Sequence, residues 1–197
     1  MNKQAKLIEQ MTDKEILKNL YATQLIMLFL AIGLAVWLFD DVSDFFAMFH
    51  WNPYQIFVIG GAVAVAVVIV DLLLLKIFPK DMLDDGGINE RVFAKRSVFH
   101  IFIIALIVAI SEELLFRGVL QSNIGYIPAS LLFALIHFRY LSKIVLFIVT
   151  IMLSFLLGYI FLLTGNLLVT IFIHFLIDFI LGFLIMFTSS KKGLKER

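Results

Sequence analysis

The sequence predicts an all-α protein, a polytopic membrane bundle of about six transmembrane helices in which the fourth is short. Three observations predict this fold class. The chain has 197 residues, 62% of them hydrophobic, and a mean hydropathy of +1.03. A soluble domain of this length carries far fewer apolar residues, so the excess must face lipid. The apolar residues also fall into runs of membrane-crossing length, and basic residues lie in alternate connections between those runs.

Each run is judged against the roughly 20 apolar residues that a helix needs to cross a bilayer. The run at 54–77 begins just after Pro53, a favoured residue in the first helical turn, and contains Asp71 and Lys76. The run at 127–138 is only about half to two thirds of the roughly 20 residues required. The predicted spans are residues 22–39, 54–77, 98–120, 127–138, 144–163 and 167–187.

The basic residues predict the orientation of the chain. All but one of the 16 Lys and Arg residues lie in the first 20 residues, around 76–96, at 139–143 or in the tail. The other connections carry none, so both termini are expected on the cytoplasmic side of a bacterial plasma membrane. The predicted segments are a cytoplasmic interfacial helix at 1–20, two flanking transmembrane helices and a cytoplasmic loop at 21–95, a catalytic-type helical core at 96–190, and a basic cytoplasmic tail at 191–197.

Other classes of function find little support in the composition. The chain has no cysteine, which excludes disulfides and thiolate metal ligands. A net charge of +1 gives no indication of a nucleic-acid partner. The lipid bilayer is therefore the partner that the composition indicates.

Charged and ionisable residues within the predicted spans are the strongest signal for function, because each costs at least about 2.5–3.5 kcal/mol at membrane depth. Asp71 lies near the end of its span, where water or Lys76 can satisfy it. Glu113 and Arg117 are four residues apart on one helix, so they can pair. Glu112 points about 100° away from Glu113 and has no helical partner, which favours a general base.

Two further spans carry histidines. His137 ends one run, and His174 lies four residues before Asp178 on the same helical face. At 1.5 Å per residue, Glu112, His137 and His174 come to a similar depth, about 10–15 Å inside the outer ends of their spans. Imidazole and carboxylate ligands suit Zn²⁺, for which His137, His174, Asp178 and Glu112 are the candidate ligands. The same residues suit metal-free hydrolysis, and both chemistries stay open at this point.

Taken together, these segments resemble the CPBP family of intramembrane proteases, which includes CAAX prenyl endopeptidases and bacteriocin-processing or immunity proteins. The resemblance rests on three ordered motifs. EExxxR is matched at 112–117, FxxxH by Phe133 and His137, and HxxxN/D by His174 and Asp178. Each motif alone is weak, and the ordered set, which covers about 98–187, is specific.

The resemblance implies a membrane-embedded protease, a metalloendopeptidase of the CAAX-protease type, whose partner is a peptide or membrane-anchored protein substrate. Glu112 would activate water, His137 would hold that water or a metal, and His174 and Asp178 would bind the metal or stabilise the oxyanion. Glu113 would complete the catalytic set, with Arg117 and Phe133 in support. Prenyl proteases carry Asn at the last motif position, so Asp178 argues against simply assuming a prenylated CAAX substrate.

Two other readings compete with the enzyme. One is a non-catalytic immunity or regulatory protein that binds a peptide or membrane partner on the same scaffold. The other is a small transporter or proton-coupled channel, because Glu, His and Asp within a membrane also form proton relays. The filled motif positions favour the enzyme, and the lack of internal symmetry argues against a transporter.

Overall fold

The computed structural model describes residues 10–83, 85–137, 140–141 and 143–195, and every regular element in these ranges is a helix. Five helical segments are long and apolar enough to cross a membrane. A sixth apolar helix, which is fourth in chain order, is shorter, as predicted. The elements are α2 (Asp13–Leu38), α3 (Val42–Phe46), η1 (Tyr54–Ile59), α4 (Gly60–Ile77), α5 (Lys80–Leu83), α6 (Ile88–Phe93), α7 (Val98–Glu113), η2 (Leu114–Gln121), α8 (Ser122–Ile124), α9 (Tyr126–Ile136), α10 (Ile144–Thr164) and α11 (Leu167–Lys195), with η marking π-helix.

Several predicted boundaries differ from those observed. No break separates an interfacial helix from the first span, because α2 runs unbroken from Asp13 to Leu38. The predicted loop after the second span contains the short helices α5 and α6. The last helix continues to Lys195, through most of the predicted tail. Other predicted features lie outside the described residues, namely residues 1–9 of the interfacial helix, Phe138, Arg139 and Arg197.

The start of α2 follows from its first residues. The Thr12 side chain accepts a hydrogen bond from the backbone N–H of Glu15, and the Glu15 carboxylate accepts one from the backbone N–H of Thr12. This capping box satisfies two backbone donors that would otherwise lack partners at the helix start. The spacing of Thr12 and Glu15 is the one that this motif requires.

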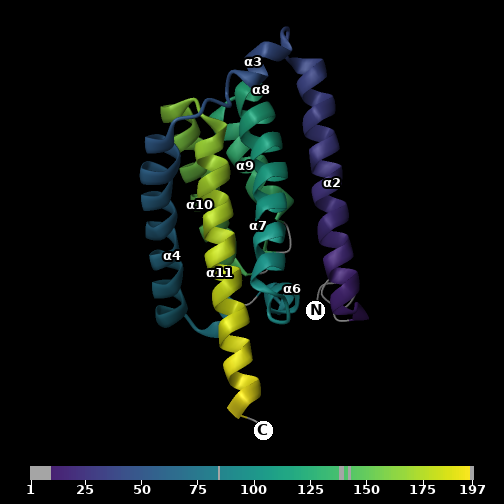
Figure 1. Cartoon of the computed structure of the whole chain (residues 1–197), viewed down its shortest axis with the longest axis vertical. Helices are drawn as coiled ribbons and strands as arrows, with labels where there is room; N and C mark the ends of the chain where they lie inside the picture. Colours follow the sequence, from purple (N-terminus) through teal and green to yellow (C-terminus); the bar gives the residue numbers. More distant parts are fainter. Residues whose placement is uncertain (1–9, 84, 138–139, 142, 196–197) are drawn as a thin grey trace.

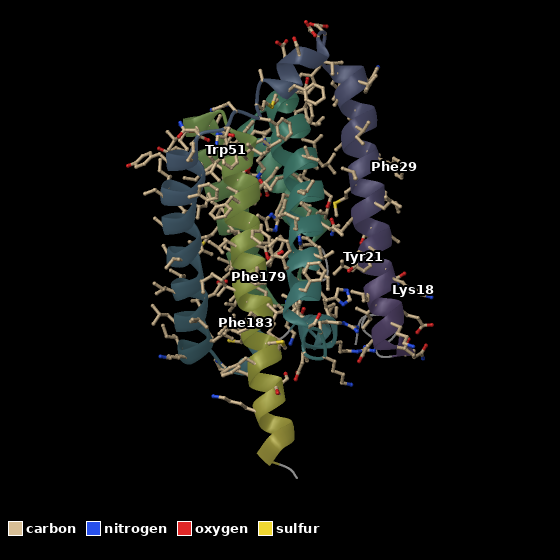
Figure 2. All side chains as sticks on the ribbon, in the orientation of Figure 1. Lys18, Tyr21, Phe29, Trp51, Phe179 and Phe183 are labelled. Atoms are coloured by element: carbon tan, nitrogen blue, oxygen red, sulfur yellow. The ribbon has the colours of Figure 1, made fainter. Side chains whose placement is uncertain are left out.

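Both ends of the chain lie at one end of the bundle, and the α3 region lies at the other (Figure 1). At the α3 end, Trp37, Trp51 and Tyr54 are 78%, 69% and 66% exposed. Phe29 projects outward from α2, away from the other helices (Figure 2), and is 65% exposed. Exposed apolar flanks with aromatic residues at one rim are typical of a helical bundle in lipid, and the protein is a multi-pass membrane protein.

Helix α11 packs against α7, α4 and α10, so the motif helices share one core (Figure 1). The turn between α10 and α11 is tied to the loop before η1. Asn166 is fully buried, and its side-chain amide donates hydrogen bonds to the His50 carbonyl and to Oε1 of Gln55. These contacts fix where α11 begins, and therefore the height of His174 in the bundle.

The contact between α10 and the motif helices requires a glycine at position 158. A Cβ there would lie 2.8 Å from the Tyr126 ring and 2.9 Å from Oε1 of Gln121. The ring cannot move freely, because the Tyr126 hydroxyl donates to the Phe155 carbonyl at 2.8 Å.

We expect Gly158→Ala to lower the free energy of unfolding by about 1–3 kcal/mol through overpacking, measured as thermal unfolding in detergent.

The matched control is Gly61→Ala in α4, where an added Cβ meets nothing within 4 Å. It should leave stability unchanged or raise it slightly through helix propensity. Equal melting temperatures for the two variants would contradict the close approach.

Candidate active site

The first motif lies where the third span changes from α-helix to π-helix. Glu112 and Glu113 are the last residues of α7, and Arg117 lies in η2. π-Helical turns are rare and are often found at functional sites. Glu112, Glu113 and Arg117 are 6%, 0% and 1% exposed. Charged residues of both signs are thus buried within a membrane span.

Arg117 is held by three kinds of contact. Its Nη1 lies 3.2 Å from Oε1 of Glu113, and its Nη2 donates to the Ser154 carbonyl at 3.0 Å. The guanidinium also lies over the Phe133 ring, 4.5 Å from the ring centroid. Such cation–π contacts gain strength away from water. The predicted ion pair between Glu113 and Arg117 is present. The other contacts of Arg117 connect η2 to α10 and α9.

Phe133 connects the second motif to the other two. Its ring packs edge-on against Phe116, with centroids 5.1 Å apart, and against His174 at 6.3 Å. It also lies 4.8 Å from the His137 ring. Phe133 is buried at 2% exposure. Phe133 therefore contacts Arg117 and both histidines.

His174 faces three carboxylates. Its Nδ1 lies 2.9 Å from Oε1 of Glu113, the same oxygen that pairs with Arg117. Its Nε2 lies 3.9 Å from Oε2 of Glu112 and 3.6 Å from Oδ2 of Asp178. Because a carboxylate accepts hydrogen bonds, Glu113 fixes the proton on Nδ1 and directs Nε2 toward the other two carboxylates.

His137 is oriented by its own helix. Its Nδ1 lies 2.8 Å from the Phe133 carbonyl, four residues earlier. A carbonyl only accepts, so Nδ1 carries the proton, and in the neutral ring Nε2 is an acceptor. His137 is half-buried, in contrast to the buried His174.

An open cleft of about 680 Å³ brings these residues together. Glu112, His137, His174 and Asp178 all line it. The remaining wall is mostly apolar and is formed by α2, α6, α7, α9, α10 and α11. The cleft extends from this polar cluster to Met11 and to Ile185, toward the end of the bundle that carries the chain termini.

The structure thus places Glu112, Glu113, His137, His174 and Asp178 in one neighbourhood, with Arg117 and Phe133 behind it. Asp71 is not among the residues that line the cleft. Sequence reasoning missed Gln24 of α2, whose side-chain amide donates to Oε1 of Glu112 at 3.2 Å. It also missed Ser111, whose hydroxyl is hydrogen-bonded to Oε1 of Gln24. A single amide in an otherwise apolar span was the signal that could have revealed Gln24.

The candidate zinc ligands can be tested against this geometry. Within residues 10–195, apart from the few positions left undescribed, no three His, Asp or Glu side chains are grouped so that they could hold a metal ion. Because Nδ1 of each histidine is engaged by Phe133 or Glu113, only the two Nε2 atoms could bind a metal. The side chains as arranged do not form a zinc site, so no step below is derived through a metal, and the choice between zinc and metal-free chemistry is tested below by direct measurement.

The fold and this centre define a multi-pass membrane protein with a buried Glu–Arg–His cluster beside an open cleft. A family model described as "Type II CAAX prenyl endopeptidase Rce1-like" matches residues 94–180, which contain all three motifs. The chain is also 45% identical over 152 residues to "Uncharacterized protein YpbD" of Bacillus subtilis (strain 168), covering 77% of this chain and 80% of that protein. The chain belongs to the Rce1-like, CAAX-protease-type family. No solved structure matches it.

Removing Arg117 should destabilise the protein strongly. Arg117→Met leaves the fully buried Glu113 without its countercharge, and breaking a buried pair from one side costs about 3–5 kcal/mol. The measurement is thermal unfolding of the purified variant in detergent. Arg117→Lys should also be destabilised, because an ammonium cannot reproduce the forked contacts to Glu113 and Ser154.

The matched control removes both charges. In the Glu113→Gln/Arg117→Met double variant no charge is left unpaired, so part of the lost stability should return. Purely additive losses in the double variant would show that the two side chains are not energetically coupled.

Proposed function

We propose that this protein is an intramembrane endopeptidase that hydrolyses a peptide bond in a membrane-associated peptide or protein. The observation that carries the proposal is the position of Glu112. Its carboxylate is buried, lies beside His174 and Asp178, and lines a cleft that also contains His137. The Rce1-like family supports the same class of activity.

Glu112 is the general base in this proposal. It takes one proton from a water molecule while Nε2 of His137 accepts a hydrogen bond from the other O–H. The water oxygen forms a bond to the carbonyl carbon, and the electron pair of the C=O bond moves to the carbonyl oxygen. The electron pair on the oxyanion then re-forms the C=O bond as the C–N bond breaks, and the proton held by Glu112 passes to the leaving amine.

His174 stabilises the oxyanion. Its Nε2 faces carboxylate oxygens of Glu112 and Asp178, and a protonated nitrogen is the group that complements them. An imidazolium N–H in a site shielded by lipid and protein is an effective donor to developing negative charge. Asp178 acts through His174 by balancing its charge. This assignment accounts for Asp where prenyl proteases carry Asn, since Asp178 need not donate a hydrogen bond itself.

The shape of the cleft supports a substrate with an apolar segment. Its carboxylate and imidazole side chains gather at the Glu112 end, and residues such as Ile88, Val92 and Leu181 line the part that extends toward the chain termini. An apolar segment in that part would place the scissile bond beside Glu112. With the termini on the cytoplasmic side of a bacterial plasma membrane, substrates would enter from the cytoplasmic face.

Glu112→Gln should abolish peptidase activity and leave the protein folded. General-base catalysis contributes about 100- to 10,000-fold, so kcat should fall by at least about 100-fold. The assay uses purified protein in liposomes with two quenched fluorogenic probes, a prenylated CAAX peptide and an apolar single-span peptide. The matched control, Glu90→Gln, changes an exposed glutamate of α6 and should keep full activity.

A folded wild type that cleaves neither probe would favour the alternative, a non-catalytic immunity or regulatory protein that binds a peptide or membrane partner. A Glu112→Gln variant as active as wild type would contradict the role of Glu112.

Metal analysis tests the remaining choice of mechanism. We expect purified wild type to contain well below one zinc per chain and to keep its activity in chelator, because Glu112 and His137 suffice to activate water. The measurement is elemental analysis of the folded protein beside His174→Ala. One zinc per chain, absent from His174→Ala, would instead make the protein a metalloprotease with His174 as a ligand.

A further inference from the structure

The first membrane helix contains one buried polar side chain, Gln24. Only four residues of α2 are buried, and the other three are Ile16, Ala31 and Ala35. Gln24 is 6% exposed, whereas its neighbours Leu25 and Ile26 are 53% and 57% exposed. An amide buried in apolar surroundings is unfavourable unless its hydrogen bonds are made. Gln24 therefore depends on specific partners across the interface with α7.

Both ends of the Gln24 amide have such partners, and they are adjacent residues of α7. Nε2 donates to Oε1 of Glu112 at 3.2 Å, and Oε1 accepts from the hydroxyl of Ser111. If the amide were turned over, its oxygen would face a carboxylate oxygen, and the two acceptors would repel. The Glu112 carboxylate, which only accepts, therefore selects the amide orientation that presents N–H to it, and the Ser111 hydroxyl holds the other end of the amide.

This contact gives the two carboxylate oxygens of Glu112 different partners. Oε1 is held by Gln24, while Oε2 is on the side of His174, at 3.9 Å from its Nε2. A carboxylate held by one oxygen cannot rotate freely, so the other oxygen keeps a fixed direction toward the reaction centre. Fixed orientation of a reacting group is a large part of enzymatic rate enhancement.

We propose that Gln24 is a positioning residue that holds the Glu112 carboxylate in its reactive orientation and is itself anchored at Oε1 by Ser111. This inference rests on the proposed function of Glu112 as general base. It extends the site to α2, which lies outside residues 94–180 matched by the family model and at the edge of the bundle (Figure 1). Because α2 also lines the cleft through Leu20 and Thr23, the seating of this helix and the geometry of the base are linked.

The test is Gln24→Met, which keeps the length of the side chain and removes both hydrogen-bonding groups. We expect kcat to fall about 10- to 100-fold, the scale of a misplaced catalytic group, with KM nearly unchanged because Gln24 acts on the base. The melting temperature in detergent should stay close to that of wild type. The matched control is Leu25→Met, which places the same side chain at the adjacent residue; Leu25 is exposed and is not among the residues that line the cleft, so this variant should keep wild-type kcat.

Ser111→Ala supplies the readout that a packing role would not give. Alone it should lower kcat, and in the Gln24→Met background it should cause no further loss, because Ser111 acts through Gln24. If Gln24→Met does not fold, Ser111→Ala alone carries the test. Full kcat in Gln24→Met, or in Ser111→Ala when the former does not fold, would overturn the inference, as would independent losses in the double variant.

Failure of the proposed function would give a different set of results from failure of the Gln24 proposal. In that case wild type would cleave neither probe, or Glu112→Gln would match wild type. An active wild type, an inactive Glu112→Gln and a fully active Gln24→Met would overturn the role of Gln24 alone.

Discussion

The burial of one ion pair inside the membrane is the constraint on which the site depends. Arg117 and Glu113 are both almost fully buried, and isolated charges at that depth would be strongly unfavourable. They are compensated by each other, by the Ser154 carbonyl and by the Phe133 ring. Because these partners come from different helices, satisfying one arginine fixes how η2, α9 and α10 pack.

Oε1 of Glu113 connects this ion pair to the candidate active site. Oε1 of Glu113 lies 3.2 Å from Nη1 of Arg117 and 2.9 Å from Nδ1 of His174. The ion pair therefore also orients the imidazole, and Nε2 is directed toward Glu112 and Asp178. The two adjacent glutamates have different positions for this reason: Glu113 faces the packed interior, and Glu112 faces the cleft.

The sequence predicted the helices and the candidate site residues better than it predicted the contacts that position those residues. Long apolar runs identify spans because lipid requires every backbone group to be satisfied within a helix. The contact of Gln24 with Glu112 was not predictable, since it joins residues far apart in the chain and depends on how α2 packs. The π-helical segment η2 has no sequence signature, and the polar end of α11 gave no sign that helix would continue.

The length of the cleft relates the expected depth of the site to the access that the proposed activity requires. Helical rise places Glu112 and His174 nearer the α3 end of their spans, whereas a protease of the CAAX type needs access from the cytoplasmic face. The two requirements are compatible because the cleft is long: the same space that contains Glu112 and His137 also reaches Asn89 of α6 and Ile185 of α11. A residue can therefore lie in the far half of the membrane and still be reached from the near side. The depth of the site in the bilayer and the face from which a substrate enters are separate properties, and the packing of α2 and α6 around the cleft determines the second.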